Sequence, residues 1–215
     1  VPQCKTCWKS EQHGHQSYRQ QLNSLVQDSK WFDAYFRNKN DYTTDLVVMS
    51  DIKVGNTCNF ACVMCNPQDS SMIYNHWVKN QQSPFVQEYV KQDPKYLENA
   101  KASGYKQTRY REYVDSAVLS NKHIKLIKLL GGEPLLDEKL MQQLKNIPAE
   151  RKSKIQLQVV TNGSLNLIKR SKQLEDFMRL KYCVSLEGIG DAQDYARLGS
   201  NWKTLESNLL EQLEY

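Results

Sequence analysis

The chain has 215 residues, enough for one domain of ordinary size with a sizeable core. Apolar residues make up 40% and charged residues 25%, a balance typical of soluble proteins that excludes collagenous, fibrous and wholly disordered chains. The formal charge of +5 is spread, with lysines and arginines interspersed among acidic residues. This pattern favours a solvated surface, so a nucleic-acid partner is not expected.

No segment contains the roughly 18 consecutive apolar residues that a membrane helix needs, and no charged-then-apolar leader opens the chain. We therefore expect a cytoplasmic protein without a membrane partner. The six cysteines form a pair, a triplet and a single residue, which does not resemble a secreted disulfide framework and favours thiolates that bind metal. The sequence begins at Val1 and stops at Tyr215 inside an amphipathic segment, so we expect truncation at the C-terminal end.

Residues 1–45 are polar and aromatic, and we expect a small N-terminal appendage with helices at 17–27 and 29–37. From residue 46 short apolar runs alternate with longer helical stretches, which is typical of βα units and a parallel sheet. The sequence therefore predicts an α/β core over 46–215 with about four βα units. The expected strands are 46–54, 123–130, 154–160 and 181–187, and the expected helices are 70–78, 137–146, 165–178 and 202–213. An insertion between the first helix and the second strand, at 80–121, is expected to be helical over 105–118.

Three cysteines lie within eight residues directly after the first predicted strand, in Cys58-Asn-Phe-Ala-Cys62-Val-Met-Cys65. Three thiolates are one ligand short of the closed tetrahedral coordination of a structural zinc site. A [4Fe-4S] cluster held by three cysteines leaves one iron open to an exogenous ligand. The spacing favours such a cluster at Cys58, Cys62 and Cys65; a zinc knuckle and buried reduced thiols are the alternatives.

Further motifs follow the later predicted strands. Gly131-Gly132-Glu133-Pro134 comes directly after the second strand, where glycines let the backbone approach a ligand and where α/β barrels bind their ligands. Taken alone, this segment is more often a strand-to-helix turn. The third and fourth strands end at Thr161-Asn162-Gly163 and at Ser185-Leu186-Glu187-Gly188, and Arg197 follows within Tyr195-Ala-Arg-Leu-Gly-Ser200.

In this order, the motifs resemble those of the radical S-adenosylmethionine (SAM) superfamily, whose members carry a Cys-x-x-x-Cys-x-x-Cys loop after the first strand of a partial (βα)6 TIM-like barrel. The resemblance implies that the open iron binds the amino and carboxylate groups of SAM. It also implies reductive cleavage of SAM to a 5′-deoxyadenosyl radical that abstracts hydrogen from an unidentified substrate, with a peptide as one expectation. A reductant such as flavodoxin or ferredoxin is expected. The alternative is a non-catalytic interaction protein that binds zinc or an iron-sulfur cluster.

The resemblance also assigns residues to SAM. Met64 takes the position near the adenine, where family members often carry an aromatic residue. Glu133 is the expected partner of the amino group, and Arg197 resembles an arginine that meets the carboxylate. Ser185 and Glu187 are expected near the ribose, with Glu187 in place of the usual aspartate. Four further residues are expected to contact the cofactor: Gly131, Gly132, Pro134 and Asn162.

A second cysteine motif, Cys4-Lys-Thr-Cys7-Trp8, opens the chain and is followed by Glu11, Gly14, Ser17 and Arg19. It resembles a twitch or SPASM-type auxiliary-cluster element placed before the barrel, as in twitch-domain radical SAM proteins, including many predicted phage proteins. Two cysteines cannot complete a [4Fe-4S] site, so an auxiliary iron-sulfur cluster would need ligands before Val1. A redox-active Cys-x-x-Cys pair and a half zinc site are the alternatives.

Period-2 alternation places the polar residues of two predicted strands on common faces: Asp51 and Lys53 in the first strand, and Gln156, Gln158 and Asn162 in and after the third. Because helices should cover the apolar faces, we expect these polar side chains to line the interior of the barrel and form a polar substrate cavity. In the fourth strand Cys183 is expected on the same face as Ser185 and Glu187, one layer deeper.

Overall fold

The computed structural model describes residues 5–27, 49–105, 121 and 123–214, and the chain divides into two compact units, Val1–Val48 and Met49–Tyr215. In the first unit, α1 (Lys5–Gln12) and α2 (Tyr18–Gln27) are described, and the expected helix at 29–37 lies outside the described residues. A capping box begins α2, because Ser17 Oγ accepts from Gln20 N while the Gln20 side chain accepts from Ser17 N. Of the described residues, no helix is long and apolar enough to cross a membrane.

The second unit contains a parallel sheet with the strand order β1-β3-β4-β5. Its strands are β1 (Met49–Lys53), β3 (Leu126–Leu130), β4 (Gln156–Thr161) and β5 (Arg179–Val184). The predicted α/β fold with four parallel strands is therefore confirmed. The strand expected over 181–187 starts two residues earlier and ends at Val184, so Ser185 and Glu187 lie in the loop that follows.

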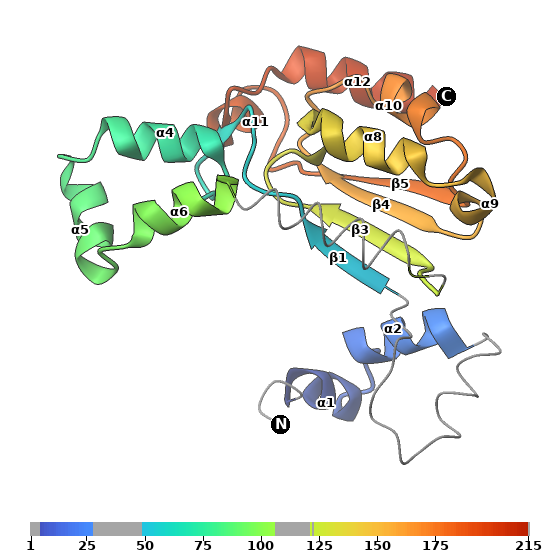
Figure 1. The fold of residues 1–215 in the computed structure, drawn as a ribbon. Coiled ribbons are helices and arrows are strands. Elements are labelled where there is room, and N and C mark those ends of the chain that lie inside the picture. Colours follow the sequence, from blue (N-terminus) through green and yellow to red (C-terminus); the bar gives the residue numbers. More distant parts are fainter. Residues whose placement is uncertain (1–4, 28–48, 106–120, 122, 215) are drawn as a thin grey trace. The chain divides into compact units, whose positions relative to one another are not determined.

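Helices cover one face of this sheet (Figure 1). They are α8 (Glu138–Asn146), α10 (Leu167–Gln173) and α12 (Trp202–Glu214), each within a predicted helix or one residue beyond it. The core lies between the two layers, where Leu140, Met141 and Leu144 of α8 pack with Ile127 and Leu157 of the sheet. Burial of such side chains is the main stabilising term of an α/β unit.

The opposite face of the sheet carries the polar residues of the strands. Asp51 lies between the buried Ser50 and Ile52, and Gln158 lies between the buried Leu157 and Val159. Since successive side chains of a strand point to opposite faces, Asp51 and Gln158 point away from the helical layer. The alternation predicted for these strands is confirmed, and Cys183 is on this polar face, half-buried.

Three helices between β1 and β3 form an arm beside the sheet (Figure 1). They are α4 (Ser71–Lys79), α5 (Pro84–Gln92) and α6 (Tyr96–Tyr105), and the helix expected over 105–118 lies almost wholly outside the described residues. The Trp77 ring packs within 5.1–5.7 Å, centroid to centroid, of the rings of Phe85, Tyr89 and Tyr96. This aromatic cluster gives the arm a small core of its own.

Shorter elements complete the unit. A 3-10 helix, η3 (Pro134–Leu136), follows β3, and α9 (Ala149–Lys152) precedes β4. After β5 the chain forms α11 (Asp191–Ala196) and β6 (Arg197–Leu198). β6 pairs antiparallel with β2 (Ala61–Cys62), so that Cys62 lies opposite Arg197.

Candidate metal centre

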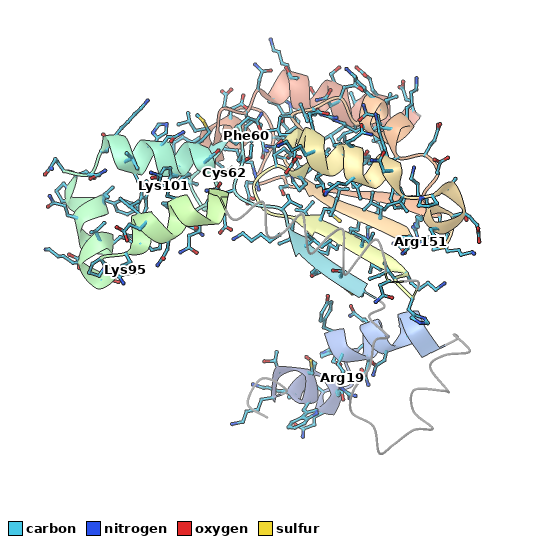
Figure 2. All side chains as sticks on the ribbon, viewed as in Figure 1. Arg19, Phe60, Cys62, Lys95, Lys101 and Arg151 are labelled. Carbon is cyan, nitrogen blue, oxygen red and sulfur yellow. The ribbon has the colours of Figure 1, made fainter. Side chains whose placement is uncertain are left out.

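The three cysteines of the Cys58–Cys65 loop lie at the carboxyl end of β1, between the sheet and the helical arm, where Figure 2 labels Cys62 and Phe60. Cys62 belongs to β2 and is 2% exposed, whereas Cys58 and Cys65 are half-buried. A turn brings Cys65 back to Cys62, since Cys65 N donates to Cys62 O at 3.0 Å. The predicted ligand residues are therefore together at one end of the sheet.

Each described contact to the sulfurs of Cys58 and Cys62 from outside the triplet is a hydrogen-bond donor. Cys58 Sγ accepts from Phe60 N at 3.5 Å and from Asn162 Nδ2 at 3.9 Å. Cys62 Sγ accepts from Arg197 Nη1 at 3.6 Å. Donors of this kind stabilise thiolates, which is the form in which cysteine binds metal.

The thiols also interact with one another. The Cys62 thiol donates to the Cys65 sulfur, which raises the pKa of Cys62 above its ordinary value and lowers the pKa of Cys65 to about 7. Burial raises the pKa of Cys58, against the hydrogen bonds from Phe60 and Asn162 that lower it. Negative charge on Cys65 raises the pKa of both Cys58 and Cys62, and negative charge on Cys58 raises the pKa of Cys62, as expected for thiols that lie close together.

The Gly131–Gly132 turn after β3 packs directly on the chain that leads to Cys58. Gly132 N donates to Gly55 O at 3.0 Å, and Glu133 N donates to Thr57 O at 2.8 Å. A Cβ at Gly132 would lie 2.2 Å from Thr57 O, and Gly131 has φ +129°. Both positions therefore need glycine, here because backbone meets backbone.

Glu133 is buried, at 1% exposure. Its carboxylate accepts from Asn162 N at 2.6 Å, from Leu135 N at 3.1 Å and from Thr161 Oγ1 at 2.9 Å. Burial raises the pKa of Glu133, and these hydrogen bonds act in the opposite direction. In this structure Glu133 joins the end of β3 to the end of β4, and a ligand contact at this carboxylate would have to displace those donors.

Asn162 connects the end of β4 to the cysteine loop. Its side chain donates to Asn59 Oδ1 at 2.9 Å as well as to Cys58 Sγ. The next residue, Gly163, is held from α12, since Asn208 Nδ2 donates to Gly163 O at 3.0 Å. Asn162 was expected at the cofactor, and the structure places it against the loop that carries the predicted metal ligands.

Glu187 and Arg197 form an ion pair at 2.7 Å beside Cys62. The Arg197 side chain is 11% exposed, and its Nε is buried without a hydrogen-bond partner among the described residues. Gln193, fully buried, accepts from Glu187 N at 2.8 Å and from Gly188 N at 3.3 Å. Sequence analysis did not identify Gln193, because a lone glutamine in a short helix carries no motif.

Met64 and the N-terminal cysteines are the remaining predicted site residues. Met64 is 50% exposed and Val63 beside it 67% exposed, so two apolar side chains of the loop face outward next to the thiols. Cys7 lies in α1 and is partly exposed, and Cys4 is outside the described residues. In the same unit Glu11 is hydrogen-bonded to Ser17 and to Arg19, and these two contacts lower its pKa.

Among the described residues no group of three or more histidine, cysteine or acidic side chains is arranged to hold a single metal ion. No protein-family model, no curated protein and no solved structure matches the chain. The assignment of the centre therefore depends on the contacts of its own residues.

Proposed function

We propose that the chain is a radical SAM enzyme in which Cys58, Cys62 and Cys65 bind a [4Fe-4S] cluster. The observation that carries the proposal is the arrangement of three thiols at the carboxyl end of a parallel sheet, where the Cys62 thiol donates to the Cys65 sulfur and negative charge on Cys65 raises the pKa of Cys58. Ligands of open α/β sheets bind at this end of the strands. A partial barrel built on the four strands is the architecture that accompanies this proposal.

The donor set fits such a cluster. Thiolates are the ligands that iron-sulfur clusters take, and hydrogen bonds to the sulfurs together with burial tune the cluster's potential. Cys62 is buried, and the Arg197 guanidinium donates to its sulfur. The loop is fixed from both sides, by the Gly131–Gly132 turn and by Ser71, whose Oγ accepts from Cys58 N at 3.1 Å.

When bound, the cluster and SAM would supply the one-electron cleavage that makes a 5′-deoxyadenosyl radical from SAM. The chain's own residues hold the thiols, orient the loop and exclude water from Cys62. Arg197 and the exposed Met64 are adjacent to the thiols and are the residues we assign to SAM, with the carboxylate at the guanidinium and the adenine at the thioether. Ser185 and Glu187, in the loop after β5, remain the residues predicted for the ribose.

Anaerobic reconstitution with iron and sulfide tests the proposal. We expect about four iron and four sulfide per chain, an electron paramagnetic resonance spectrum that changes when SAM is added, and 5′-deoxyadenosine after reduction. Cys58→Ser, Cys62→Ser and Cys65→Ser are each expected to abolish the 5′-deoxyadenosine, whereas Cys183→Ser, a matched control on the polar sheet face, retains it. Zinc bound without iron, or a cluster that does not respond to SAM, would establish the non-catalytic alternative instead.

A further inference from the structure

The loop after β5 closes around one buried glutamine. Gln193 of α11 is fully buried, and its side-chain Oε1 accepts from Glu187 N at 2.8 Å and from Gly188 N at 3.3 Å. Its Nε2 donates to Ser185 O at 3.5 Å. The orientation of the amide follows from these partners, because only its oxygen can accept from two N–H groups. The shape of the loop at residues 185–188 is therefore fixed from inside the protein.

Gln193 also holds the start of β6. Arg197, the C-cap of α11, donates its backbone N–H to Gln193 O. Gln193 thus contacts both members of the ion pair between Glu187 and Arg197, the first through its side chain and the second through its main chain. Since β6 pairs with β2, Arg197 lies opposite Cys62. One residue therefore connects the loop after β5 to the strand pair that carries a predicted metal ligand.

Arg197 depends on its carboxylate partner. The Arg197 side chain is 11% exposed, and its Nε has no hydrogen-bond partner among the described residues. A guanidinium held away from water with an unpaired donor is destabilised, and the Glu187 carboxylate at 2.7 Å offsets this loss of hydration. The same guanidinium donates through Nη1 to Cys62 Sγ at 3.6 Å. If Glu187 moved away, we would expect Arg197 to turn towards water and Cys62 to lose this donor.

The Glu187 side chain does not secure this pair by itself. It is 40% exposed, and an exposed carboxylate on a free loop gains little from an ion pair, because ordering its side chain opposes the attraction. The Gln193 amide fixes the backbone of Glu187 beforehand, which reduces the conformational entropy that the pair has to overcome. Gln193 therefore acts on Cys62 through Glu187 and Arg197.

We propose that Gln193 is a positioning residue for the metal centre: it holds Glu187 so that Arg197 keeps its hydrogen bond to Cys62 Sγ. The effect on a bound iron-sulfur cluster rests on the proposed function, whereas the hold on the loop does not. Hydrogen-bond donors and positive charge beside a cluster stabilise its more negative, reduced form and so raise its reduction potential. A change at Gln193 that releases Arg197 should therefore lower the potential.

Hydrogen exchange of the chain without a cluster, followed by nuclear magnetic resonance, tests the hold on the loop. Gln193→Asn is the variant, because it keeps the amide but withdraws it by one C–C bond, about 1.5 Å. We expect the Glu187 and Gly188 amides to exchange about threefold to tenfold faster, since each loses a hydrogen bond. The Asn162 amide, which donates to Glu133, is the internal control and should change less than about twofold. Unchanged exchange at Glu187 and Gly188, or a variant that does not fold, would overturn the proposal.

Redox titration of the reconstituted chain tests the effect at the centre. We expect Gln193→Asn to lower the equilibrium constant for reduction about threefold to tenfold, which for one electron is about 30–60 mV. Arg197→Met should lower it at least as much, and Gln193→Asn added to Arg197→Met should lower it no further, because changes that act through one contact are not additive. Ser171→Ala is the matched control: it removes a buried hydroxyl whose partners are Tyr182 and Gln212, and it should leave the potential unchanged.

A positive shift in Gln193→Asn would overturn the proposal, because a loop that only opened would admit water, which also stabilises the reduced cluster. No shift, or the same shift in the Arg197→Met background, would overturn it as well. The proposed function is judged separately, from the iron content and the 5′-deoxyadenosine formed by the wild type. Zinc bound without iron refutes that function, and amide exchange then decides the hold on the loop. An iron-sulfur cluster whose potential is unchanged in Gln193→Asn refutes only the positioning role.

Discussion

Replacement of Gly132 by alanine would force the turn after β3 away from the chain that leads to the cysteines. The new Cβ would lie 2.2 Å from Thr57 O and 2.8 Å from the carbonyl carbon of Asn56, both backbone atoms that have no rotamer to change. The loop or the turn has to move by about 1 Å to restore ordinary van der Waals contact.

That movement breaks two hydrogen bonds, from Gly132 N to Gly55 O and from Glu133 N to Thr57 O. Each contributes about 1 kcal/mol net, and the overpacking adds about 1–3 kcal/mol. We expect Gly132→Ala to lower the free energy of unfolding by about 3–5 kcal/mol and to reduce iron loading of the chain, because the shift is passed to Cys58.

Urea denaturation followed by circular dichroism measures the change in stability, and iron analysis after anaerobic reconstitution measures the effect on the centre. Gly188→Ala is the control: its Cβ would lie 3.0 Å from Ala192 Cβ, a contact that a shift of a few tenths of an ångström relieves, and we expect a loss below about 1 kcal/mol with full iron loading. A Gly132→Ala protein with the stability and iron content of the wild type would refute the docking of this turn on the loop.

Two further substitutions test buried polar groups. Glu133→Gln replaces one carboxylate oxygen by an amide nitrogen, a donor that would face the donor Asn162 N or Leu135 N. We expect the free energy of unfolding, measured by urea denaturation, to fall by about 2–4 kcal/mol. A fall of less than about 0.5 kcal/mol would contradict these contacts. Burial raises the pKa of Tyr182, so the phenol holds its proton more tightly in the folded protein than in the unfolded chain. This difference stabilises the folded protein fully below the unfolded pKa of about 10, and the stabilisation is lost as the pH rises through the pKa of the folded protein. Unfolding free energies from pH 9 to about 11 should therefore fall more steeply for the wild type than for Tyr182→Phe, and parallel curves would exclude this role.

The strands and the two faces of the sheet could be predicted because they depend on local pattern. Alternation in Asp51 to Lys53 and in Gln156 to Gln158 identifies the polar face without knowledge of any partner strand.

The helical arm shows a signal that sequence analysis did not use: Ser83 precedes Pro84, and Ser83 Oγ accepts from Val86 N as an N-cap of α5. The boundary of β5 was wrong by two residues at the start and three at the end, because Gln193 binds the backbone of Glu187 and takes that segment out of the ladder.

The role of Glu133 shows where local reasoning stops. A carboxylate after two glycines at a strand end suggests a ligand contact, since such ends are functional in α/β barrels. Its actual partners come from Asn162, 29 residues later, and from Leu135 in the next turn. A single sequence carries no pattern for that pairing, because only the parallel alignment of β3 and β4 brings the two strand ends together.

Two of the three sulfurs of the loop accept hydrogen bonds from different distant segments. Asn162 at the end of β4 donates to Cys58, and Arg197 in β6, which pairs with β2 over only two residues, donates to Cys62. These contacts join residues 104 and 135 positions apart in the chain. The spacing of the cysteines therefore indicates the kind of centre, whereas the donors to two of its sulfurs come from segments that only the fold brings to this end of the sheet. The loop alone, cut free as a peptide, would keep the ligands and the Phe60 donor but lose the donors from Asn162 and Arg197 that help to stabilise the thiolates.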